Sequence, residues 1–578
     1  MKELLLGNAA IARGAYEAGV RVATAYPGTP STEITEIISG YGEIYSEWSP
    51  NEKVAFEAAL GASVAGVRAM VCMKHVGLNV AADPLFTASY TGVGGGLLVV
   101  VADDPGMFSS QNEQDTRYIA RAAHLPVLEP SNSAEAKEYV RLAFEISESY
   151  DTPVILRTTT RLAHGQSVTE IGERVERAVI PYVKNPAKYV MMPANAKNRH
   201  IVVEKRMNDL QKACDGGGVQ KEIDYSKLNS ITYNDRKTGI LCSGIVYQYV
   251  KEALPNASVF KLGMAYPLPI ERIREFAKNV ENLIVIEELE PFFEEQLKIN
   301  GIECRGKELF SRQGELSVNI IKEALLGVKA VAPDNALPGR PPVLCAGCPH
   351  RGVFYVLSKL KMTVCGDIGC YTLGALAPLS AVDTVVCMGA GIGMAHGFSK
   401  ALPDKKNTVA VIGDSTFIHS GITGLIDCVY NKGNTTVLIL DNSTTGMTGH
   451  QNHPATGKTI KEEETVKLDL ETLCKACGVT SVVTVAADDL AGIEKAVKEE
   501  TARAGVSVII ARKPCELILK TSRKPYRITE ACKKCKACLK IGCPAIQSID
   551  NRIEIKAEMC VGCGLCEKLC AFGAIKGE

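Results

Sequence analysis

The chain has 578 residues, 46% of them hydrophobic and 22% charged, with 65 basic and 65 acidic side chains and 21 cysteines. At about 100–200 residues per domain this length predicts three to five domains, and the globular composition excludes a single small module and the disordered, collagenous and coiled-coil classes. A formal charge of zero gives no basic field for nucleic acid, no apolar run reaches about 18 residues, and Met1-Lys2-Glu3-Leu4 opens no signal peptide; we therefore expect a soluble, cytoplasmic protein that binds neither nucleic acid nor membrane.

Residues 1–190 alternate short apolar runs with helical patterns, which is typical of a parallel α/β sheet. Strands are predicted at 22–26 and 96–102, each followed by a turn. The loop Tyr26-Pro27-Gly28-Thr29-Pro30-Ser31 joins the first strand to a helix, and Ser31 is its natural N-cap. A second helix begins within 49–62, with Glu52 in its first turn, where the helix dipole favours even an ordinary solvated glutamate.

The middle of the chain predicts a boundary and a further α/β unit. Residues 191–236 are polar and read as a linker or surface excursion. Strands at 239–242 and 283–286 place the next unit at 237–330, and the prolines of 331–342 suit an extended connector.

A third α/β unit, at 343–524, places polar groups at one sheet edge. Gly413-Asp414-Ser415 follows a strand at 408–412, and Asp441-Asn442 ends the next strand at 436–440. A carboxylate and a carboxamide offer the oxygen ligands that Mg²⁺ prefers, and Gly413 allows close backbone approach to a diphosphate. The alternative is an ordinary turn at the end of a strand.

The final segment, 525–578, holds eight cysteines in a repeated three-plus-one spacing. Three thiolates two residues apart suit one face of an iron–sulfur cubane, and the fourth comes from the other repeat, so the spacing predicts two [4Fe–4S] clusters with crossed ligation. Zinc is the alternative, and disulfides are disfavoured in a reducing compartment. A hairpin is predicted at 546–556. The two predicted sets are Cys532, Cys535, Cys538 and Cys570, and Cys543, Cys560, Cys563 and Cys566.

These motifs carry a resemblance to known families. The tail resembles a bacterial two-cluster ferredoxin, although four residues rather than three separate Cys538 from Cys543. Gly413-Asp414-Ser415 with a downstream asparagine resembles the thiamine diphosphate signature, with Ser415 in place of its second glycine. That resemblance implies Mg²⁺ ligation by Asp414, Asn442 and the main chain of Thr444. The run Gly446-Met447-Thr448-Gly449-His450-Gln451 resembles the diphosphate-side stretch of 2-oxoacid:ferredoxin oxidoreductases, which places Gly446, Met447 and Thr448 near the cofactor.

Taken together, the whole chain resembles the alpha subunits of indolepyruvate:ferredoxin oxidoreductases, a thiamine diphosphate-dependent family. The resemblance implies a pyrimidine-type domain at 1–190, a transketolase C-terminal-like domain at 237–330, a diphosphate domain at 343–524 and a ferredoxin-like domain at 525–578. Glu52 is then the catalytic glutamate, with Glu57 as its competitor, and Thr29 faces the substrate carboxylate. A third cluster is implied at four further cysteines, which are otherwise ordinary buried residues: Cys345, Cys348, Cys370 and Cys515.

The reaction implied by this resemblance is oxidative decarboxylation of an aryl 2-oxoacid with coenzyme A, giving an aryl-acetyl thioester, CO₂ and reduced ferredoxin. A smaller beta subunit is the expected partner, in a hetero-oligomer of two large and two small chains. Three alternatives stay open: the same chemistry on pyruvate or another aliphatic acid, a non-redox thiamine diphosphate lyase, and an electron-transfer subunit with inactive α/β domains. The aryl preference rests on the resemblance alone, because pocket preferences cannot be read from sequence.

Overall fold

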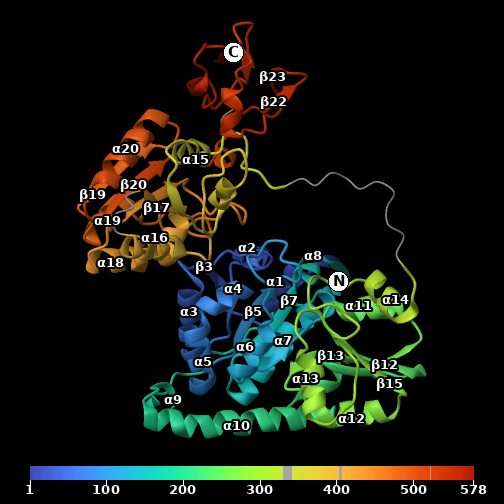
Figure 1. The fold of residues 1–578 in the computed structure, drawn as a ribbon. Helices are drawn as coiled ribbons and strands as arrows, with labels where there is room; N and C mark the ends of the chain where they lie inside the picture. Colours follow the sequence, from blue (N-terminus) through green and yellow to red (C-terminus); the bar gives the residue numbers. More distant parts are fainter. Residues whose placement is uncertain (330–340, 403–406, 521–522, 578) are drawn as a thin grey trace. The chain divides into compact units, whose positions relative to one another are not determined.

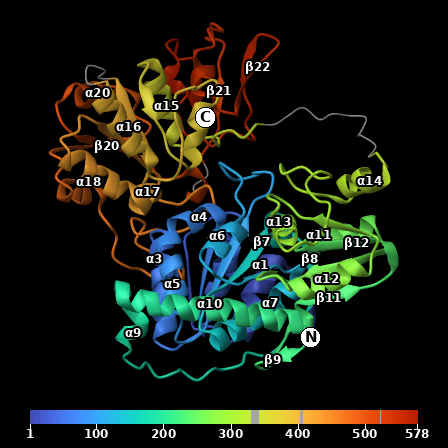
Figure 2. The ribbon, with the colours of Figure 1, turned by 60° about the horizontal axis from the view of Figure 1, so that its bottom comes forward.

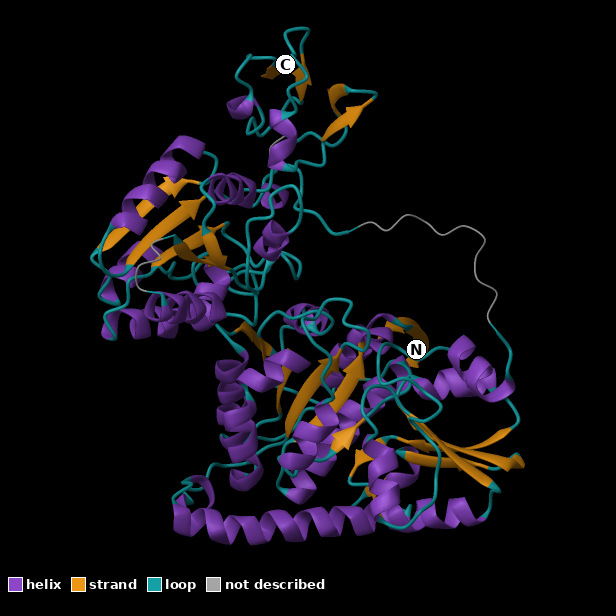
Figure 3. Cartoon of the chain, in the orientation of Figure 1, coloured by secondary structure: helices purple, strands orange, loops and turns teal. Residues whose placement is uncertain are grey.

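The computed structural model describes residues 1–329, 341–402, 407–520 and 523–577. The chain divides into two compact units, Met1–Asn335 (unit 1) and Ala336–Glu578 (unit 2). Figure 1 follows the chain through them, and Figure 3 shows strands layered between helices in each. The connector expected at 331–342 lies almost wholly outside the described residues.

Unit 1 contains a seven-stranded sheet with the order β14-β6-β7-β5-β4-β2-β3. Neighbouring strands are parallel except β14, which runs antiparallel to β6. Because parallel strands need crossover connections, helices cover both faces of such a sheet. The strands are β2 (Val22–Ala25), β3 (Tyr45–Trp48), β4 (Ala69–Lys74), β5 (Leu97–Asp103), β6 (Val127–Leu128), β7 (Val154–Thr159) and β14 (Met264–Tyr266).

Alternate side chains of these strands enter two different cores. In β4, Met70 and Cys72 pack into one hydrophobic cluster, whereas Ala69, Val71 and Met73 pack into the other. All five are almost completely buried. Since successive side chains of a strand point to opposite faces, a continuous apolar run is what a sheet covered on both sides requires.

The helices of unit 1 place the loops at the carboxyl ends of the strands. Helix α3 begins where the Asn51 side chain accepts a hydrogen bond from Val54 N at 2.9 Å, and this cap fixes Glu52 in the first turn. The helices are α1 (Gly7–Glu17), α2 (Thr32–Ser39), α3 (Glu52–Val64), α4 (His75–Val80), α5 (Ala82–Thr91), α6 (Thr116–Ala122), α7 (Ser133–Tyr150) and α8 (Thr160–His164); β1 (Lys2–Leu6) pairs with β8 (Gln166–Glu170).

The polar segment 191–236, expected to be a linker or a surface excursion, is largely a surface helix. Helix α10 (Pro193–Gly216) buries a narrow stripe that includes Val203, Met207 and Leu210, and contacts α5 and α12. Figure 2 shows α10 lying across its neighbours in unit 1. One buried stripe on an otherwise polar helix explains why composition suggested a linker. Short elements flank it: α9 (Pro186–Tyr189), β9 (Val219–Gln220), β10 (Ile223–Asp224) and a 3₁₀ turn at Tyr225–Lys227.

The rest of unit 1 is a four-stranded sheet of order β11-β13-β12-β15. Its central strands are parallel, and β11 is antiparallel to β13. One face shares a core with the seven-stranded sheet through Leu241, Phe260 and Val285. The elements are β11 (Asn229–Thr232), β12 (Asp235–Ser243), β13 (Ala257–Leu262), β15 (Asn282–Ile286), α11 (Val246–Ala253), α12 (Ile270–Lys278), α13 (Phe292–Ile299) and α14 (Val318–Leu326).

Unit 2 is built on a five-stranded parallel sheet of order β16-β17-β18-β20-β19. Two hydrophobic clusters cover its faces. The strands are β16 (Thr363–Cys365), β17 (Thr408–Gly413), β18 (Thr436–Asp441), β19 (Ser481–Ala486) and β20 (Ser507–Arg512). The helical segments are α15 (His350–Lys359), α16 (Ala390–Ala401), α17 (Asp414–Thr416), a π turn at Phe417–Gly421, α18 (Ile422–Tyr430), α19 (Leu470–Ala476), α20 (Leu490–Ala502), and 3₁₀ turns at Cys370–Ala375 and Glu516–Ile518.

The cysteine-rich end of unit 2 has little regular structure. The hairpin expected at 546–556 is confirmed: β22 (Ile546–Ile549) pairs with β23 (Arg552–Ile555), and Asp550 and Asn551 at its turn both have positive φ. A second pair joins β21 (Tyr526–Ile528) to β24 (Ile575–Gly577), with 3₁₀ turns at Ala537–Ile541 and Glu567–Leu569. Its small core consists of isoleucines, Leu565 and the cysteines themselves.

Candidate functional site

The expected convergence at the edge of the unit 2 sheet is present. Strands β17 and β18 are parallel neighbours, with Gly413 in register with Leu440. Asp414 and Asn442 therefore follow the carboxyl ends of adjacent strands, and both are buried. Ser443 N donates to Asp414 Oδ2 at 2.8 Å, which ties the two strand ends together.

Three oxygen atoms meet at this edge. The side-chain oxygen of Asn442 lies 3.1 Å from Asp414 Oδ1 and 3.0 Å from the main-chain oxygen of Thr444, and rotating the carboxamide would replace these contacts with two hydrogen bonds. Octahedral Mg²⁺ with Mg–O distances of 2.0–2.1 Å separates adjacent ligand oxygens by about 2.9–3.0 Å. The donor set and its spacing therefore fit a magnesium ion.

The charges around these oxygens also suit a cation. Burial and the neighbouring charge of Asp414 raise the pKa of Asp441, while Arg512 counteracts them through a 2.7 Å hydrogen bond to Asp441 Oδ2. His453 Nδ1 accepts from Ala455 N at 3.3 Å, and its buried Nε2 lies 3.3 Å from Asp414 Oδ2 without making a hydrogen bond. Sequence analysis missed this neighbour of Asp414 because an isolated histidine carries no distinguishing pattern.

The backbone next to Asp414 is enclosed by Tyr371. A Cβ added to Gly413 would lie 2.5 Å from Tyr371 Cε1, and the Tyr371 hydroxyl donates to Thr416 Oγ1 at 2.8 Å. The glycine is therefore required by packing as well as by approach to a ligand. Asp367 accepts from Gly389 N and Gly391 N at 2.8 and 2.9 Å and so fixes the glycine run before α16.

The other residues expected beside the cofactor form the turn after β18. Ser415 Oγ accepts a hydrogen bond from Thr445 Oγ1 at 2.9 Å, and Thr448 Oγ1 donates to Gln451 Oε1 at 2.5 Å. Met447 is 53% exposed. A Cβ on Gly446 would lie 3.5 Å from Cys370 Sγ and 3.6 Å from Asn442 Nδ2, so this turn lies between the oxygen cluster and a cysteine.

Four cysteines of unit 2 influence one another beside the oxygen cluster. Burial raises the pKa of Cys370 to about 11, with added repulsion from Cys515 and Cys345. Burial likewise raises the pKa of Cys348 to about 12, with Cys370 and Cys345 as nearby thiols. Cys515 N donates to the main-chain oxygen of Asn442 at 2.9 Å. These mutual effects place the thiols near one another, but no three such side chains of the described residues form a group that could hold a metal ion, so the third cluster stays a prediction.

The eight cysteines of the tail lie in the two expected groups. The thiols that act on Cys538, after burial, are Cys532, Cys535 and Cys570. Burial raises the pKa of Cys566 to about 12, and the thiols that add to this effect are Cys563, Cys543 and Cys560. Among the described residues, however, no three His, Cys, Asp or Glu side chains are close enough to be recognised as a metal site, so cluster ligation stays a prediction.

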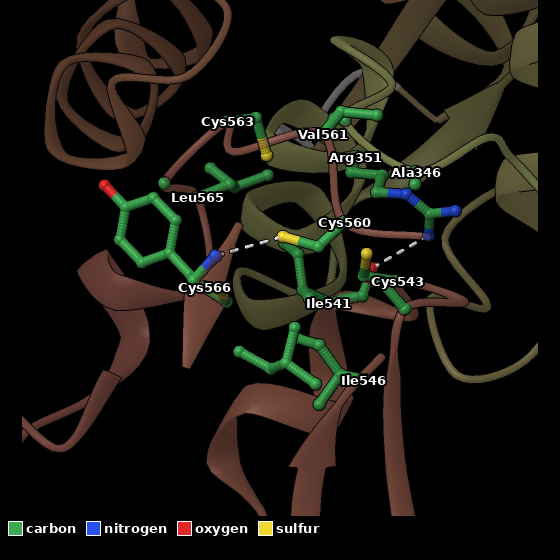
Figure 4. A pocket seen from close by; sticks show the side chains of 15 residues that line it. Ala346, Arg351, Ile541, Cys543, Ile546, Cys560, Val561, Cys563, Leu565 and Cys566 are labelled. Carbon is green, nitrogen blue, oxygen red and sulfur yellow. Dashed lines mark hydrogen bonds between the residues drawn. The ribbon is translucent and has the colours of Figure 1, made fainter. Parts of the chain in front are cut away.

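One cysteine group lines a small, mainly apolar pocket. Figure 4 shows the sulfur atoms of Cys543, Cys560 and Cys563 beside it, and Tyr526 N donates to Cys560 Sγ at 3.3 Å. N–H···S bonds and an apolar wall are the surroundings that protein-bound iron–sulfur clusters use. The lining therefore fits a cluster; the other lining side chains are mainly Ile541, Ile546, Ile555, Val561 and Leu565.

In unit 1, Glu52 and Glu57 have different surroundings. Glu52 is 5% exposed and lies against α4, where a Cβ on Gly77 would come within 2.5 Å of Glu52 Oε1. Glu57 is half exposed and pairs with Lys53 at 3.0 Å. Burial and the close approach of Gly77 distinguish Glu52 from an ordinary solvated glutamate.

The loop that carries Thr29 adjoins a buried lysine. Thr29 O accepts from Ser109 Oγ at 3.4 Å, and a Cβ on Gly28 would lie 3.1 Å from Lys74 Cβ. Lys74 is 8% exposed, and its ammonium donates to the main-chain oxygen of Ser109. Burial lowers the pKa of Lys74 to about 8, and Asp104 counteracts this. Sequence analysis missed Lys74 because a lysine at the end of a strand is indistinguishable from a solvated one.

No helix of the described ranges combines the length and the apolar character needed to cross a membrane.

Comparison with known proteins gives matches along both units. The profile of the family "Pyruvate flavodoxin/ferredoxin oxidoreductase, thiamine diP-bdg" matches residues 13–220, and that of "Thiamine pyrophosphate enzyme, C-terminal TPP binding domain" matches residues 367–511. Indolepyruvate oxidoreductase subunit IorA of Archaeoglobus fulgidus is 41% identical, covering 100% of this chain and 97% of its own. The subunit of the same name from Pyrococcus horikoshii is 42% identical over the same shares.

Proposed function

Since the chain belongs to the family of indolepyruvate oxidoreductase subunits IorA, thiamine diphosphate-dependent 2-oxoacid:ferredoxin oxidoreductases, we propose that it carries out oxidative decarboxylation of aryl 2-oxoacids. Coenzyme A is the acyl acceptor and ferredoxin the electron acceptor. The products are an aryl-acetyl thioester, CO₂ and reduced ferredoxin. The name of the relatives as a subunit supports a partner chain. We propose that this partner is the smaller chain and that the assembly has two large and two small subunits.

The observation that carries this proposal is that the terminal carboxamide of Asn442 lies 3.1 Å from Asp414 Oδ1 and 3.0 Å from the main-chain oxygen of Thr444. These residues would hold Mg²⁺ and, through it, the diphosphate of the cofactor. Gly413 gives the backbone access, Tyr371 backs that glycine, and His453 Nε2 lies 3.3 Å from Asp414 Oδ2. When bound there, thiamine diphosphate would supply a carbon nucleophile toward the keto group and an electron sink for decarboxylation.

The residues of unit 1 handle protons and substrate charge. Glu52, buried against Gly77, exchanges a proton with the aminopyrimidine ring of the cofactor. Thr29 orients the substrate carboxylate, and Lys74 supplies its counter-charge from the adjoining strand end. The buried Lys74 ammonium donates to the main-chain oxygen of Ser109 and has the carboxylate of Asp104 nearby. An incoming substrate carboxylate would therefore stabilise its charge.

The three cysteine groups support the redox form of the reaction. Single-electron carriers suit electrons that leave one at a time, and iron–sulfur clusters accept one electron each. We assign the group Cys345, Cys348, Cys370 and Cys515 as the first electron acceptor, and the hydrogen bond from Cys515 N to the Asn442 main-chain oxygen and the closeness of Gly446 to Cys370 support this assignment. A non-redox lyase would leave all twelve thiols without a purpose.

The decisive test is anaerobic purification of the chain with its partner subunit, followed by thiamine, iron and sulfide analysis and a dye-reduction assay. Indolepyruvate, phenylpyruvate and pyruvate are compared with and without coenzyme A. We expect aryl substrates to give the larger kcat/KM and coenzyme A to be required for turnover. A larger kcat/KM for pyruvate would overturn the aryl assignment, and CO₂ release without dye reduction would establish the lyase instead.

A further inference from the structure

Arg351 is a buried cation that joins two parts of unit 2. It lies in the first turn of α15 and is 2% exposed. Its guanidinium donates to the main-chain oxygens of Cys345 and Ile541, each at 3.1 Å, and also to those of Leu344 and Gly542. Within the described parts of the chain it makes no ion pair with a carboxylate. A guanidinium bonded only to carbonyls keeps its positive charge uncompensated.

The titratable side chains that act on Arg351 are cysteine thiols of two different groups. Burial lowers the pKa of Arg351, and the groups that counteract burial are Cys543, Cys348, Cys345 and Cys563. Figure 4 shows Arg351 at the rim of the pocket bounded by Cys543, Cys560 and Cys563, with its bond to Ile541 drawn. The same side chain is thus adjacent to the 345–348 loop and to one cysteine group of the tail.

The contact between these two parts is close at the backbone level. Ala346 and Gly347 line the same pocket. A Cβ on Gly347, whose φ is +73°, would lie 2.4 Å from Val561 Cγ2. The loop between Cys345 and Cys348 therefore packs directly on the segment between Cys560 and Cys563.

On the basis of the cluster assignments of the proposed function, we infer that Arg351 is a positioning residue that stabilises the reduced state of the cluster at Cys543, Cys560, Cys563 and Cys566. That cluster would be the first to receive electrons from the group formed by Cys345, Cys348, Cys370 and Cys515. Reduction adds one electron and one negative charge to a cluster and requires no proton. A fixed positive charge in a poorly solvated site favours the more negative state and so raises the reduction potential.

The inference is tested on the anaerobic complex by redox titration followed by electron paramagnetic resonance. Arg351→Gln removes the charge and Arg351→Lys keeps it. Cys563→Ser identifies the signal that belongs to this cluster. We expect Arg351→Gln to make reduction of that cluster at least tenfold less favourable, a shift of 59 mV toward negative potential for one electron, with the other signals unmoved.

The matched control is Arg206→Gln. Arg206 is also buried and bonds to main-chain oxygens of Asp151 and Ser89, but it lies in α10 of unit 1. We expect this variant to lose stability without any change of potential. Arg351→Lys should keep the parent potential even where the loop packs less well.

An unchanged potential in Arg351→Gln with full iron content would overturn the inference and leave the proposed function intact. So would an equal shift in Arg351→Lys and Arg351→Gln, because a purely structural role does not follow charge. Absence of iron from the unmodified complex is a separate result, which would overturn the proposed function and this inference with it.

Discussion

Glu52 shows how a single residue acquires its chemistry from its neighbours. Asn51 caps the N-terminus of α3 immediately before Glu52. Gly77 of α4 leaves space for the Glu52 carboxylate that a larger residue would occupy. Glu57, one turn later on the same helix, faces solvent and pairs with Lys53. The two glutamates of this helix thus differ in burial, and neither their residue type nor their spacing reveals that difference.

We expect Glu52→Gln to reduce kcat by about 10²–10⁴-fold, because proton transfer by a positioned carboxyl group contributes on that order. Glu57→Gln is the matched control and should retain the parent rate. The rates of both variants are measured by dye reduction at saturating thiamine diphosphate. Binding of the cofactor is measured separately by isothermal titration calorimetry. Equal losses in the two variants would contradict the assignment of Glu52.

Lys74 predicts a pH dependence of substrate binding. Its pKa of about 8 means that the ammonium is charged below that pH and neutral above it, so attraction of the substrate carboxylate is complete below pH 8 and is lost as pH rises through it. We expect KM for the 2-oxoacid to rise above pH 8, and Lys74→Met to raise KM about tenfold or more at pH 7.

The control for Lys74 is Lys307→Met. Lys307 also has a pKa lowered by burial and donates to a main-chain oxygen, that of Glu287, at 2.7 Å. Its removal should leave KM and its pH profile unchanged. A Lys74→Met variant with the parent KM would refute the role in substrate binding.

At the scale of the element, the sequence was most informative about the strands, because the position of a strand also places the residues at its end. The strands expected at 22–26, 96–102, 239–242, 283–286, 408–412 and 436–440 are confirmed as β2, β5, β12, β15, β17 and β18. Because β17 and β18 are adjacent and parallel, the meeting of Asp414 and Asn442 followed from the order of elements alone.

Elements whose role depends on distant partners were less accessible. Helix α10 buries a narrow stripe and contacts both α5, which lies more than 100 residues earlier, and α12, which follows it; local periodicity cannot identify such partners. His453 and Tyr371 reach the cofactor edge from loops whose course is set by tertiary packing. Arg351 lies close in sequence to two cysteines, but two of its acceptors, the main-chain oxygens of Ile541 and Gly542, lie 190 and 191 residues away.

At the scale of the whole molecule, the cysteine groups predict the iron content. Three [4Fe–4S] clusters require twelve irons per chain, whereas two require eight. We expect about twelve in the anaerobic protein and about eight in Cys370→Ser, with both clusters of the tail retained in the resonance spectrum.

The control is Cys474→Ser, which alters a buried cysteine of α19 outside the three groups. It should keep about twelve irons. An unmodified chain with about eight irons would remove the third cluster from the proposal and would require another electron path from the cofactor.

The contacts of Asn442 predict how the protein responds to oxygen during purification. Its side chain faces the Asp414 carboxylate, and its carbonyl accepts the hydrogen bond of Cys515 N. If oxygen damages a cluster bound by Cys515, the hydrogen bond from Cys515 N to Asn442 would therefore also be disturbed, and thiamine diphosphate would be bound less tightly. Oxygen exposure should cost such a preparation its colour and its thiamine in step.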